Sequence, residues 1–488
     1  MRDLTGHTET RHGDMLDKRR RTHDGCFACR RRRKRCDLRR PRCKGCERNA
    51  LLCRWALPGT TDEQSPAETE ASACTFRNPS IQKTPTGLGV ASCVLKGPIS
   101  SLLFKHYLQE TGNAISAHRG PLNSFIQLLP CFAISYPNTV LQSLLALSGM
   151  HYRCRASSVD VDVMTFTHLG LALRSLKHGL TVFASSQFRS DNLQLLVTTL
   201  ILCFLETVRV DQSGDVVHHL KAANVLFNTL ITSPEQDQDN PKLLEFIKEF
   251  YVYVKNITAL TGTLSSSTLF ISTFSESANT IFVSQHGPGN LLGCSYELFN
   301  MVPHIEALAT RGHYYLYTTP NHEADESYRQ QNFQLHTYLS SWQPPEGTLP
   351  EFALSGFMYR EAFLCLVERT SPSVDVRHRD IVDATRINNF LDLLNLLPLE
   401  APVSTTSIWP IIFFGVLARN QSHQALIYTR LAHMNQMFGF GNIRSSMVFL
   451  QSCWDRQGKS SGLAELQVSD DLDLFSLMKV MNFNISLL

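Results

Sequence analysis

The spacing of six cysteines constrains the fold of this chain more than any other feature of its sequence. Of 14 cysteines in total, these six lie between residues 26 and 53 in the pattern C-x2-C-x6-C-x6-C-x2-C-x6-C. The pattern is one half-motif, C-x2-C-x6-C, written twice. Its members are Cys26, Cys29, Cys36, Cys43, Cys46 and Cys53. A segment of this size has too little core to fold by itself, so bonds made by the cysteines are expected to hold it together.

Two observations favour metal ligation over disulfides. The N-terminus is polar and charged and has no apolar stretch of the kind that a secretory signal peptide contains. The longest apolar stretch, Leu193 to Leu205, is too short to span a bilayer and is interrupted by polar residues. We therefore expect neither a secreted nor a membrane protein. In a reducing compartment, clustered cysteines act more often as metal ligands than as disulfides.

The number of thiols indicates how many metal ions the repeat can hold. Structural zinc takes four ligands in a tetrahedron. One ion would leave two thiols unused, whereas two separate ions would need eight. Six thiolates satisfy two ions if two sulfurs bridge both metals, and the first cysteine of each half, Cys26 and Cys43, is the natural pair. Sulfur then fills every coordination position, so the two zinc ions are predicted to be structural, with no open site for water.

The segment from Gly25 to Asp37, followed by Arg40 to Cys46 and by Cys53, is similar to the fungal Zn(II)2Cys6 binuclear cluster. The likeness covers every cysteine, the basic run and the proline before the fourth cysteine. It implies that the first and fourth cysteines bridge, in agreement with the stoichiometry. It also implies a nuclear, sequence-specific transcription factor that binds double-stranded DNA and regulates RNA polymerase II genes.

Six consecutive cations, residues 30–35, lie between the second and third cysteines. In the family that the sequence resembles, this segment is a short helix whose end enters the major groove. Matched by position, Arg33, or its neighbour Arg32, is expected to read a CGG-type triplet, since an Arg fork pairs bidentately with guanine. The other cations are better placed to contact phosphates. The predicted DNA-binding residues are Arg30, Arg31, Arg32, Arg33, Lys34, Arg35, Arg42 and Lys44.

Charge is distributed unevenly along the chain. Residues 1–60 hold 18 Lys and Arg against 7 Asp and Glu, whereas the remainder has a net charge of −8. A basic head of this kind indicates a polyanionic partner. Within residues 1–21, a basic N-terminal arm, Lys18 to Arg21 form a patch that suits nuclear import or phosphate contact; a plain disordered arm is the alternative.

Residues 56–97 are predicted to form a disordered linker, because they contain four prolines and no sustained apolar period. Many proteins of the resembled family dimerise through heptads at this position. No apolar heptad pattern extends over three heptads here. Binding as a monomer and dimerisation through the rest of the chain therefore both remain open.

Beyond the linker, apolar residues recur with a helical period and period-two strands are scarce, which predicts a large all-α domain over residues 98–488. Four short motifs in order resemble the fungal-specific transcription factor domain, which implies a regulatory role and coregulators or a second copy as partners. Helices are expected at 163–186, 190–209, 215–232, 241–260, 325–341, 353–370, 381–397, 408–436, 442–456 and 470–482. The motifs are Leu103–Tyr107, Leu144–Gly149, Trp409–Pro410 with Ala418–Arg419, and Gly439–Asn442 leading to Trp454.

No sequence motif in this large domain indicates catalysis. Gly287 to Gly293 has the wrong spacing for a dinucleotide loop, and Gly439 to Asn442 fits a helix–helix turn better. The eight scattered cysteines, Trp409 and Trp454 are expected in the core. Residues 469–475 mix acidic and bulky apolar side chains, as activation segments do, but a Ser-capped final helix is favoured.

The sequence thus predicts a zinc-cluster DNA-binding domain at 22–55, joined by the linker to the helical regulatory domain. The leading hypothesis is a nuclear transcription factor that is not an enzyme. The alternative is a transcriptional cofactor that keeps the zinc fold but acts mainly through its helical body, without strong sequence preference.

Overall fold

The computed structural model separates the chain into two compact units, Met1–Pro85 and Thr86–Leu488. Each unit is described by itself. The structure describes residues 26, 29, 34, 36–40, 43–48, 95, 97–156, 158–185, 192–209, 216–232, 240–261, 287–308, 322–369, 376–459, 477–478, 481, 483, 485 and 487–488. The segment 469–475 lies outside these residues, and so does the predicted linker 56–97 except for residues 95 and 97.

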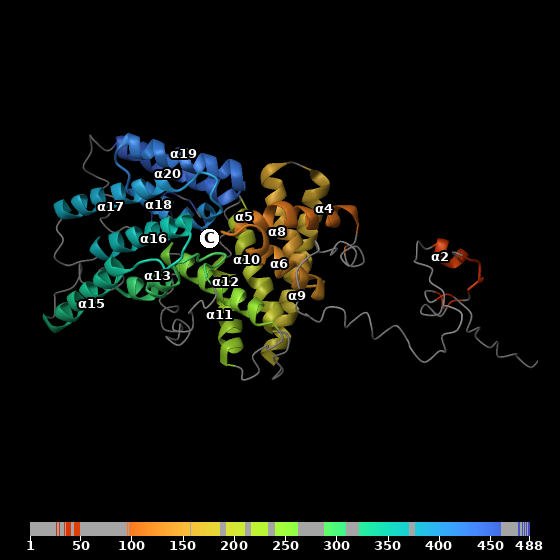
Figure 1. Ribbon diagram of the computed structural model, residues 1–488. Helices are drawn as coiled ribbons and strands as arrows, with labels where there is room; N and C mark the ends of the chain where they lie inside the picture. Colours follow the sequence, from red (N-terminus) through yellow and green to blue (C-terminus); the bar gives the residue numbers. More distant parts are fainter. Residues whose placement is uncertain are drawn as a thin grey trace, which may run out of the picture. The chain divides into compact units, whose positions relative to one another are not determined.

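The second unit, called the body below, is built from helices, and its described residues contain no strand (Figure 1). Together with the thiol cluster of the first unit, this confirms the predicted fold class of a small cysteine-rich module followed by an all-α body. The α-helices are α4 (Pro98–His106), α5 (Gly112–Ile115), α6 (Ser124–Gln127), α7 (Leu129–Ser135), α8 (Val140–Arg155), α9 (Val159–Ser185), α10 (Asn192–Val208), α11 (Val216–Thr232), α12 (Pro241–Leu260), α13 (Tyr296–Asn300), α15 (His322–Ser341), α16 (Pro350–Arg369), α17 (Val376–Leu396), α18 (Ile408–Leu417), α19 (Gln421–Phe438) and α20 (Gly441–Lys459). Shorter turns are the π-helix η1 (Tyr107–Thr111) and the 3-10 helices η2 (Gly120–Leu122) and η4 (Pro402–Ser407).

The helices pack in two groups that meet in the middle of the body. Helix α8 contacts α4, α9 and α10, and α10 also packs on α11 and α12. In the other group α16 contacts α15, α17 and α18, and α18 contacts α19 and α20. Figure 1 accordingly shows α4, α8 and α9 at one end of the body and α15 and α17 at the other.

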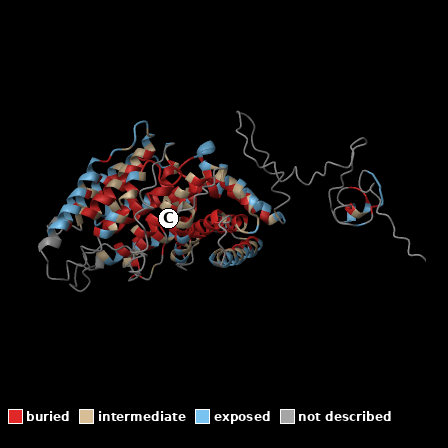
Figure 2. Cartoon of the chain, turned by 90° about the horizontal axis from the view of Figure 1, so that it is seen from below, coloured by how far each residue is buried: buried red, intermediate tan, exposed pale blue. Residues whose placement is uncertain are grey.

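The two most apolar helices form the core of the two groups. Every residue of α18 is buried, and so are nearly all residues of α10, because a helix that is apolar all round is stable only inside a protein. Figure 2 shows buried residues inside the body and exposed ones on its outer surface. Trp409 and Trp454 are both buried, and Trp454 Nε1 donates to the carbonyl of Gly415 over 2.9 Å. The prediction that these tryptophans belong to the core is confirmed.

One predicted helix is wrong. The continuous helix expected over 408–436 is two helices, α18 and α19, separated by Ala418 to Asn420. The backbone adopts an extended conformation at Ala418 (ψ 109°), which ends α18. The side chain of Asn420 then caps α19 by accepting a hydrogen bond from the N–H of Ser422 over 2.9 Å. The turn predicted at Gly439 is confirmed: its left-handed backbone (φ 70°) ends α19 just before α20 begins.

The scattered cysteines follow the prediction in part. Four of them, Cys203, Cys294, Cys365 and Cys453, are buried as small apolar residues. Cys131 is exposed and Cys154 is half-buried, so for these two the prediction is wrong. Cys74 and Cys93 lie outside the described residues.

Among the helices that the structure describes, none is long and apolar enough to cross a membrane.

The glycine-rich segment Gly287–Gly293 is folded around a carboxylate of the protein itself. Glu249, on α12, accepts hydrogen bonds from three consecutive backbone N–H groups, those of Asn290 (3.1 Å), Leu291 (2.7 Å) and Leu292 (2.9 Å). Burial raises the pKa of Glu249, and the three donors oppose this rise without cancelling it. The segment is therefore an internal anion-binding loop that connects to α12.

A buried histidine connects α8 to the end of α19. His151 Nε2 lies 2.7 Å from the carbonyl of Phe438, and Nδ1 lies 2.9 Å from the hydroxyl of Thr111. Since a carbonyl only accepts, Nε2 carries the hydrogen and Nδ1 accepts from Thr111 in the neutral ring. Burial lowers the pKa of His151 to about 3, and the nearby His106 and Arg155 act in the same direction.

This histidine should make the stability of the body depend on pH. In the unfolded chain a histidine binds its proton below a pKa of about 6.5, whereas folded His151 does not until about 3. The free energy of unfolding should therefore fall as pH drops below about 6.5, by up to about 1.4 kcal/mol per pH unit from this group. Urea unfolding at pH 7.5, 6.5 and 5.5 would measure the slope.

His151→Gln should flatten that slope, while His178→Gln, a change at an exposed histidine of α9, should leave it unchanged. An identical pH dependence in the unaltered chain and in His151→Gln would assign the effect to other groups.

Candidate metal centre and nucleic-acid interface

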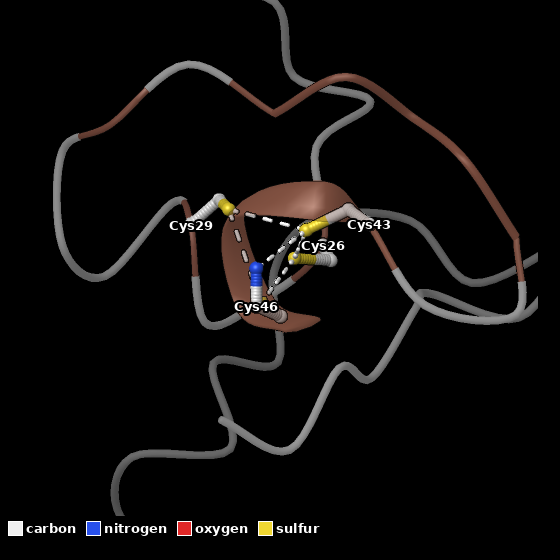
Figure 3. Close-up of side chains that lie close together, drawn as sticks. All are labelled: Cys26, Cys29, Cys43 and Cys46. Atoms are coloured by element: carbon white, nitrogen blue, oxygen red, sulfur yellow. Dashed lines mark hydrogen bonds between the residues drawn. The ribbon is translucent and has the colours of Figure 1, made fainter. Parts of the chain in front are cut away.

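Four cysteine side chains of the repeat converge beside the short helix α2 (Lys44–Arg48), as Figure 3 shows. The ligand atoms of Cys26, Cys29, Cys43 and Cys46 all lie within 4.8 Å of one another, and all four residues are buried. Cys36 is buried as well, and its sulfur lies within the same limit of Cys43. Cys53 lies outside the described residues. None of the five described cysteines forms a disulfide.

The spacing of the sulfurs fits tetrahedral zinc. Adjacent sulfurs around one zinc ion, each about 2.3 Å from the metal, lie roughly 3.8 Å apart. The observed Sγ–Sγ distances are 3.7 Å for Cys26–Cys43, 3.6 Å for Cys26–Cys46 and 3.6 Å for Cys29–Cys43. A disulfide would need about 2.05 Å, so these contacts have the geometry of shared metal ligands rather than of disulfides.

The two half-motifs fold in the same way locally. In the first half the N–H of Cys29 donates to the carbonyl of Cys26 over 3.1 Å, and in the second half the N–H of Cys46 donates to that of Cys43 over 3.1 Å. The C-x2-C spacing thus produces the same turn twice and brings both thiols of each turn to one side. The repeat seen in the sequence is therefore a repeat in the backbone.

An aspartate outside the predicted ligand set stabilises the second half. The backbone N–H of Lys44, at the start of α2, donates to both carboxylate oxygens of Asp37, with N–O distances of 3.1 and 3.2 Å. An acid at a helix N-terminus pairs with free N–H groups there. Sequence analysis gave Asp37 no role. Only the residue type could have indicated this role, since Asp is a common helix-capping residue.

The electrostatic surroundings differ between the thiols. Burial alone would raise the pKa of Cys43, but hydrogen bonds from the Cys46 N–H (3.3 Å to Sγ) and from neighbouring thiols lower it to about 6. Burial raises the pKa of Cys29 to about 12. These hydrogen bonds favour the thiolate of Cys43, the form that binds metal.

The described part of the module presents cations around the sulfur cluster. Lys34 and Lys44 are exposed, as are Arg39 and Arg40. Arg39 lies 3.7 Å from Glu47, an ion pair so exposed that it contributes little to stability. Of the predicted DNA-binding residues, the structure describes only Lys34 and Lys44; Arg30, Arg31, Arg32, Arg33, Arg35 and Arg42 lie outside the described residues.

A cysteine-rich module with zinc-ligand geometry, followed by an all-helical body, defines the class of zinc-cluster regulators. Comparison with known families agrees over most of the chain. Residues 24–60 match the fungal Zn(2)-Cys(6) binuclear cluster domain, a domain that binds two zinc ions, and residues 101–488 match the fungal specific transcription factor domain. The chain belongs to the fungal zinc-cluster transcription factors.

Individual relatives are similar over a short part of the chain. The zinc cluster transcription factor CZF1 of Candida albicans (strain SC5314) is 43% identical over 61 residues, which is 12% of this chain. Zinc finger protein 1 of Candida albicans (strain WO-1) shows the same identity over the same length. The match spans 15% of the length of each of these curated relatives. No solved structure matches the chain.

Proposed function

We propose that all six cysteines hold two zinc ions, with Cys26 and Cys43 bridging them. One ion would take the three cysteines of the first half plus Cys43, and the other the three of the second half plus Cys26. Of the four sulfur pairs between the two C-x2-C turns, the three shortest each share an ion under this assignment. Cys29 and Cys46 share none, and their separation of 4.0 Å is the longest of the four.

We propose further that the chain is a nuclear transcription factor of RNA polymerase II genes that reads a CGG-type triplet through Arg33 or Arg32. The observation that supports this most is the anchoring of the basic run. Buried Cys29 precedes it and buried Cys36 follows it, and the N–H of Lys34 donates back to the carbonyl of Cys29 over 3.0 Å. The described residues at both ends of the run thus lie at the cluster, and we propose that the cations between them contact a groove of the DNA.

The two units would have different functions. The zinc module, proposed at 22–55, would bind double-stranded DNA, and Arg30, Arg31, Lys34, Arg35, Arg42 and Lys44 would contact phosphates. The body, proposed at 98–488, would bind a coregulator or a second copy of the chain. The matched families are non-enzymatic, and we propose no reaction for this chain.

Arg33→Ala is expected to weaken binding to the preferred site by about 1–3 kcal/mol and to relax discrimination at one base pair, because a bidentate contact to guanine is lost. Binding of a randomised oligonucleotide pool, sequenced before and after selection, gives the preference at each position. Fluorescence anisotropy with the selected site gives the affinity.

Lys44→Ala is the matched control, since Lys44 is an exposed cation of the same module. It should weaken binding to all sequences alike and reduce the slope of affinity against salt by about 1. If Arg33→Ala behaves in the same uniform way, Arg33 is a phosphate contact. If the unaltered chain selects no sequence at all, the role of a cofactor acting through the body is favoured instead.

A further inference from the structure

Helix α9 presents an apolar seam to solvent. Val159, Val163, Phe166 and Leu173 are 78%, 59%, 47% and 41% exposed, although α9 packs its other face on α8 and α10. With two further residues, the seam follows the alternating four- and three-residue spacing of a coiled coil. Its members in order are Val159, Val163, Phe166, Gly170, Leu173 and Lys177.

Gly170 is unexplained by the packing of the body itself. A glycine in the middle of a 27-residue helix weakens that helix relative to alanine. The neighbouring glycines have a packing reason: a Cβ at Gly149 would overlap Thr165, and one at Gly179 would lie 2.5 Å from Leu195. At Gly170, the nearest atom of the described protein is Arg174 Nη1 on the same helix, at 3.4 Å. No other described residue fills the space above Gly170, so this space suits a bulky group from a partner.

We propose that this seam is the dimer interface of the chain, with α9 of a second copy docked antiparallel across a twofold axis level with residue 168. In that register Phe166 lies opposite Gly170 of the second copy, and the reverse contact forms by symmetry. Val163 lies opposite Leu173, and Val159 opposite the aliphatic stem of Lys177. The bulky ring and the glycine are thus complementary parts of one self-complementary surface.

Charge supports the same partner and the same direction. Asp160 and Arg174 flank the seam on one edge, and neither forms an ion pair within the described part of the chain. An antiparallel pair places Asp160 of each copy beside Arg174 of the other, twice per dimer. A parallel pair would instead oppose Lys177 to Lys177 and Gly170 to Gly170, leaving a like-charge contact and a void. This placement goes beyond DNA binding and does not depend on the zinc module.

Sedimentation equilibrium of the zinc-loaded full chain, without DNA and under reducing conditions, tests the proposal. We expect a reversible dimer whose dissociation constant rises at least tenfold in Phe166→Glu and in Gly170→Leu. Phe333→Glu is the matched control, because Phe333 on α15 is 71% exposed and lies off the seam. It should leave the dimer unchanged, and far-UV circular dichroism should show equal helix content in all variants.

A charge exchange tests the register. Asp160→Arg and Arg174→Asp should each weaken the dimer, since each places like charges together, and the double variant should restore it. Cys26→Ser should leave the dimer intact even if it loses zinc and DNA binding, so the two proposals can fail separately. A monomer at all concentrations, or a dimer that tolerates Phe166→Glu, would refute the proposal. Failure of the double variant to restore the dimer would refute the antiparallel register.

Discussion

Replacing Cys26 with serine is expected to reduce the zinc content below two ions per chain and to abolish sequence-specific DNA binding. The proposed arrangement makes Cys26 a ligand of both ions, and its sulfur lies 3.7 Å from Cys43 and 3.6 Å from Cys46. Structural zinc contributes roughly 10–16 kcal/mol to the folding of small zinc-dependent domains. Loss of a shared ligand should therefore unfold the module. Metal analysis and anisotropy with the selected DNA site measure the two effects.

Two further variants separate bridging from ordinary ligation. Cys36 would bind only one ion, so Cys36→Ser should retain zinc at the second site and lose less than Cys26→Ser. Cys131 is an exposed cysteine of the body, and Cys131→Ser should keep both zinc ions and full DNA affinity. Two zinc ions and unchanged binding in Cys26→Ser would rule out the bridged cluster. Equal losses in Cys26→Ser and Cys36→Ser would show that the two sulfurs act alike.

The metal centre could be predicted from the sequence because ligand number and spacing are local properties. C-x2-C brings two thiols together in one turn, and the structure shows that turn twice. The contribution of Asp37 could not be predicted in the same way. Its carboxylate reaches the N–H of Lys44 only because the chain folds back between them, and Leu38 in this return has a positive φ of 60°. Such a contact depends on tertiary geometry, which residue spacing does not encode.

In the body, the period of the apolar residues predicted the positions of the helices well. It predicted the ends of the helices and the faces that they bury less well. Expected helices at 190–209, 215–232 and 241–260 correspond closely to α10, α11 and α12. The expected helix 408–436 failed because no Gly or Pro lies between Leu417 and Gln421 to mark the break at Asn420. In α9, apolar residues occur on both the buried and the exposed face. Periodicity alone cannot tell which of two apolar faces packs inside.

The segment from Gly287 to Gly293 shows a different limit. Its glycine spacing does not fit a dinucleotide loop, and the sequence predicted no other role for it. The segment binds the carboxylate of Glu249, which lies about 40 residues earlier in the chain on α12. Gly289 is required at this position because a Cβ would overlap the carboxylate of Glu249 and the hydroxyl of Tyr296. No local pattern links a helix glutamate to a loop so far away in the sequence.

Replacing Glu249 with alanine is expected to have the largest effect on the stability of the body. The substitution leaves the N–H groups of Asn290, Leu291 and Leu292 without their acceptor in a buried place. Each orphaned buried donor costs about 1–3 kcal/mol, so three together should lower the free energy of unfolding by roughly 3–9 kcal/mol. That is a large part of the roughly 5–15 kcal/mol typical of a folded protein. Urea unfolding followed by circular dichroism measures the loss.

Glu249→Gln tests whether the acceptor or the charge matters. An amide oxygen can still accept from two of the three N–H groups, but its NH2 faces the third, so a loss of about 1–3 kcal/mol is expected. Glu245→Ala removes a half-buried carboxylate one turn earlier on α12 and should cost less than either. Because the zinc module is a separate unit, all three variants should retain two zinc ions per chain. A Glu249→Ala chain as stable as Glu245→Ala would mean that the loop does not need its internal anion, since water would then satisfy the three donors equally well.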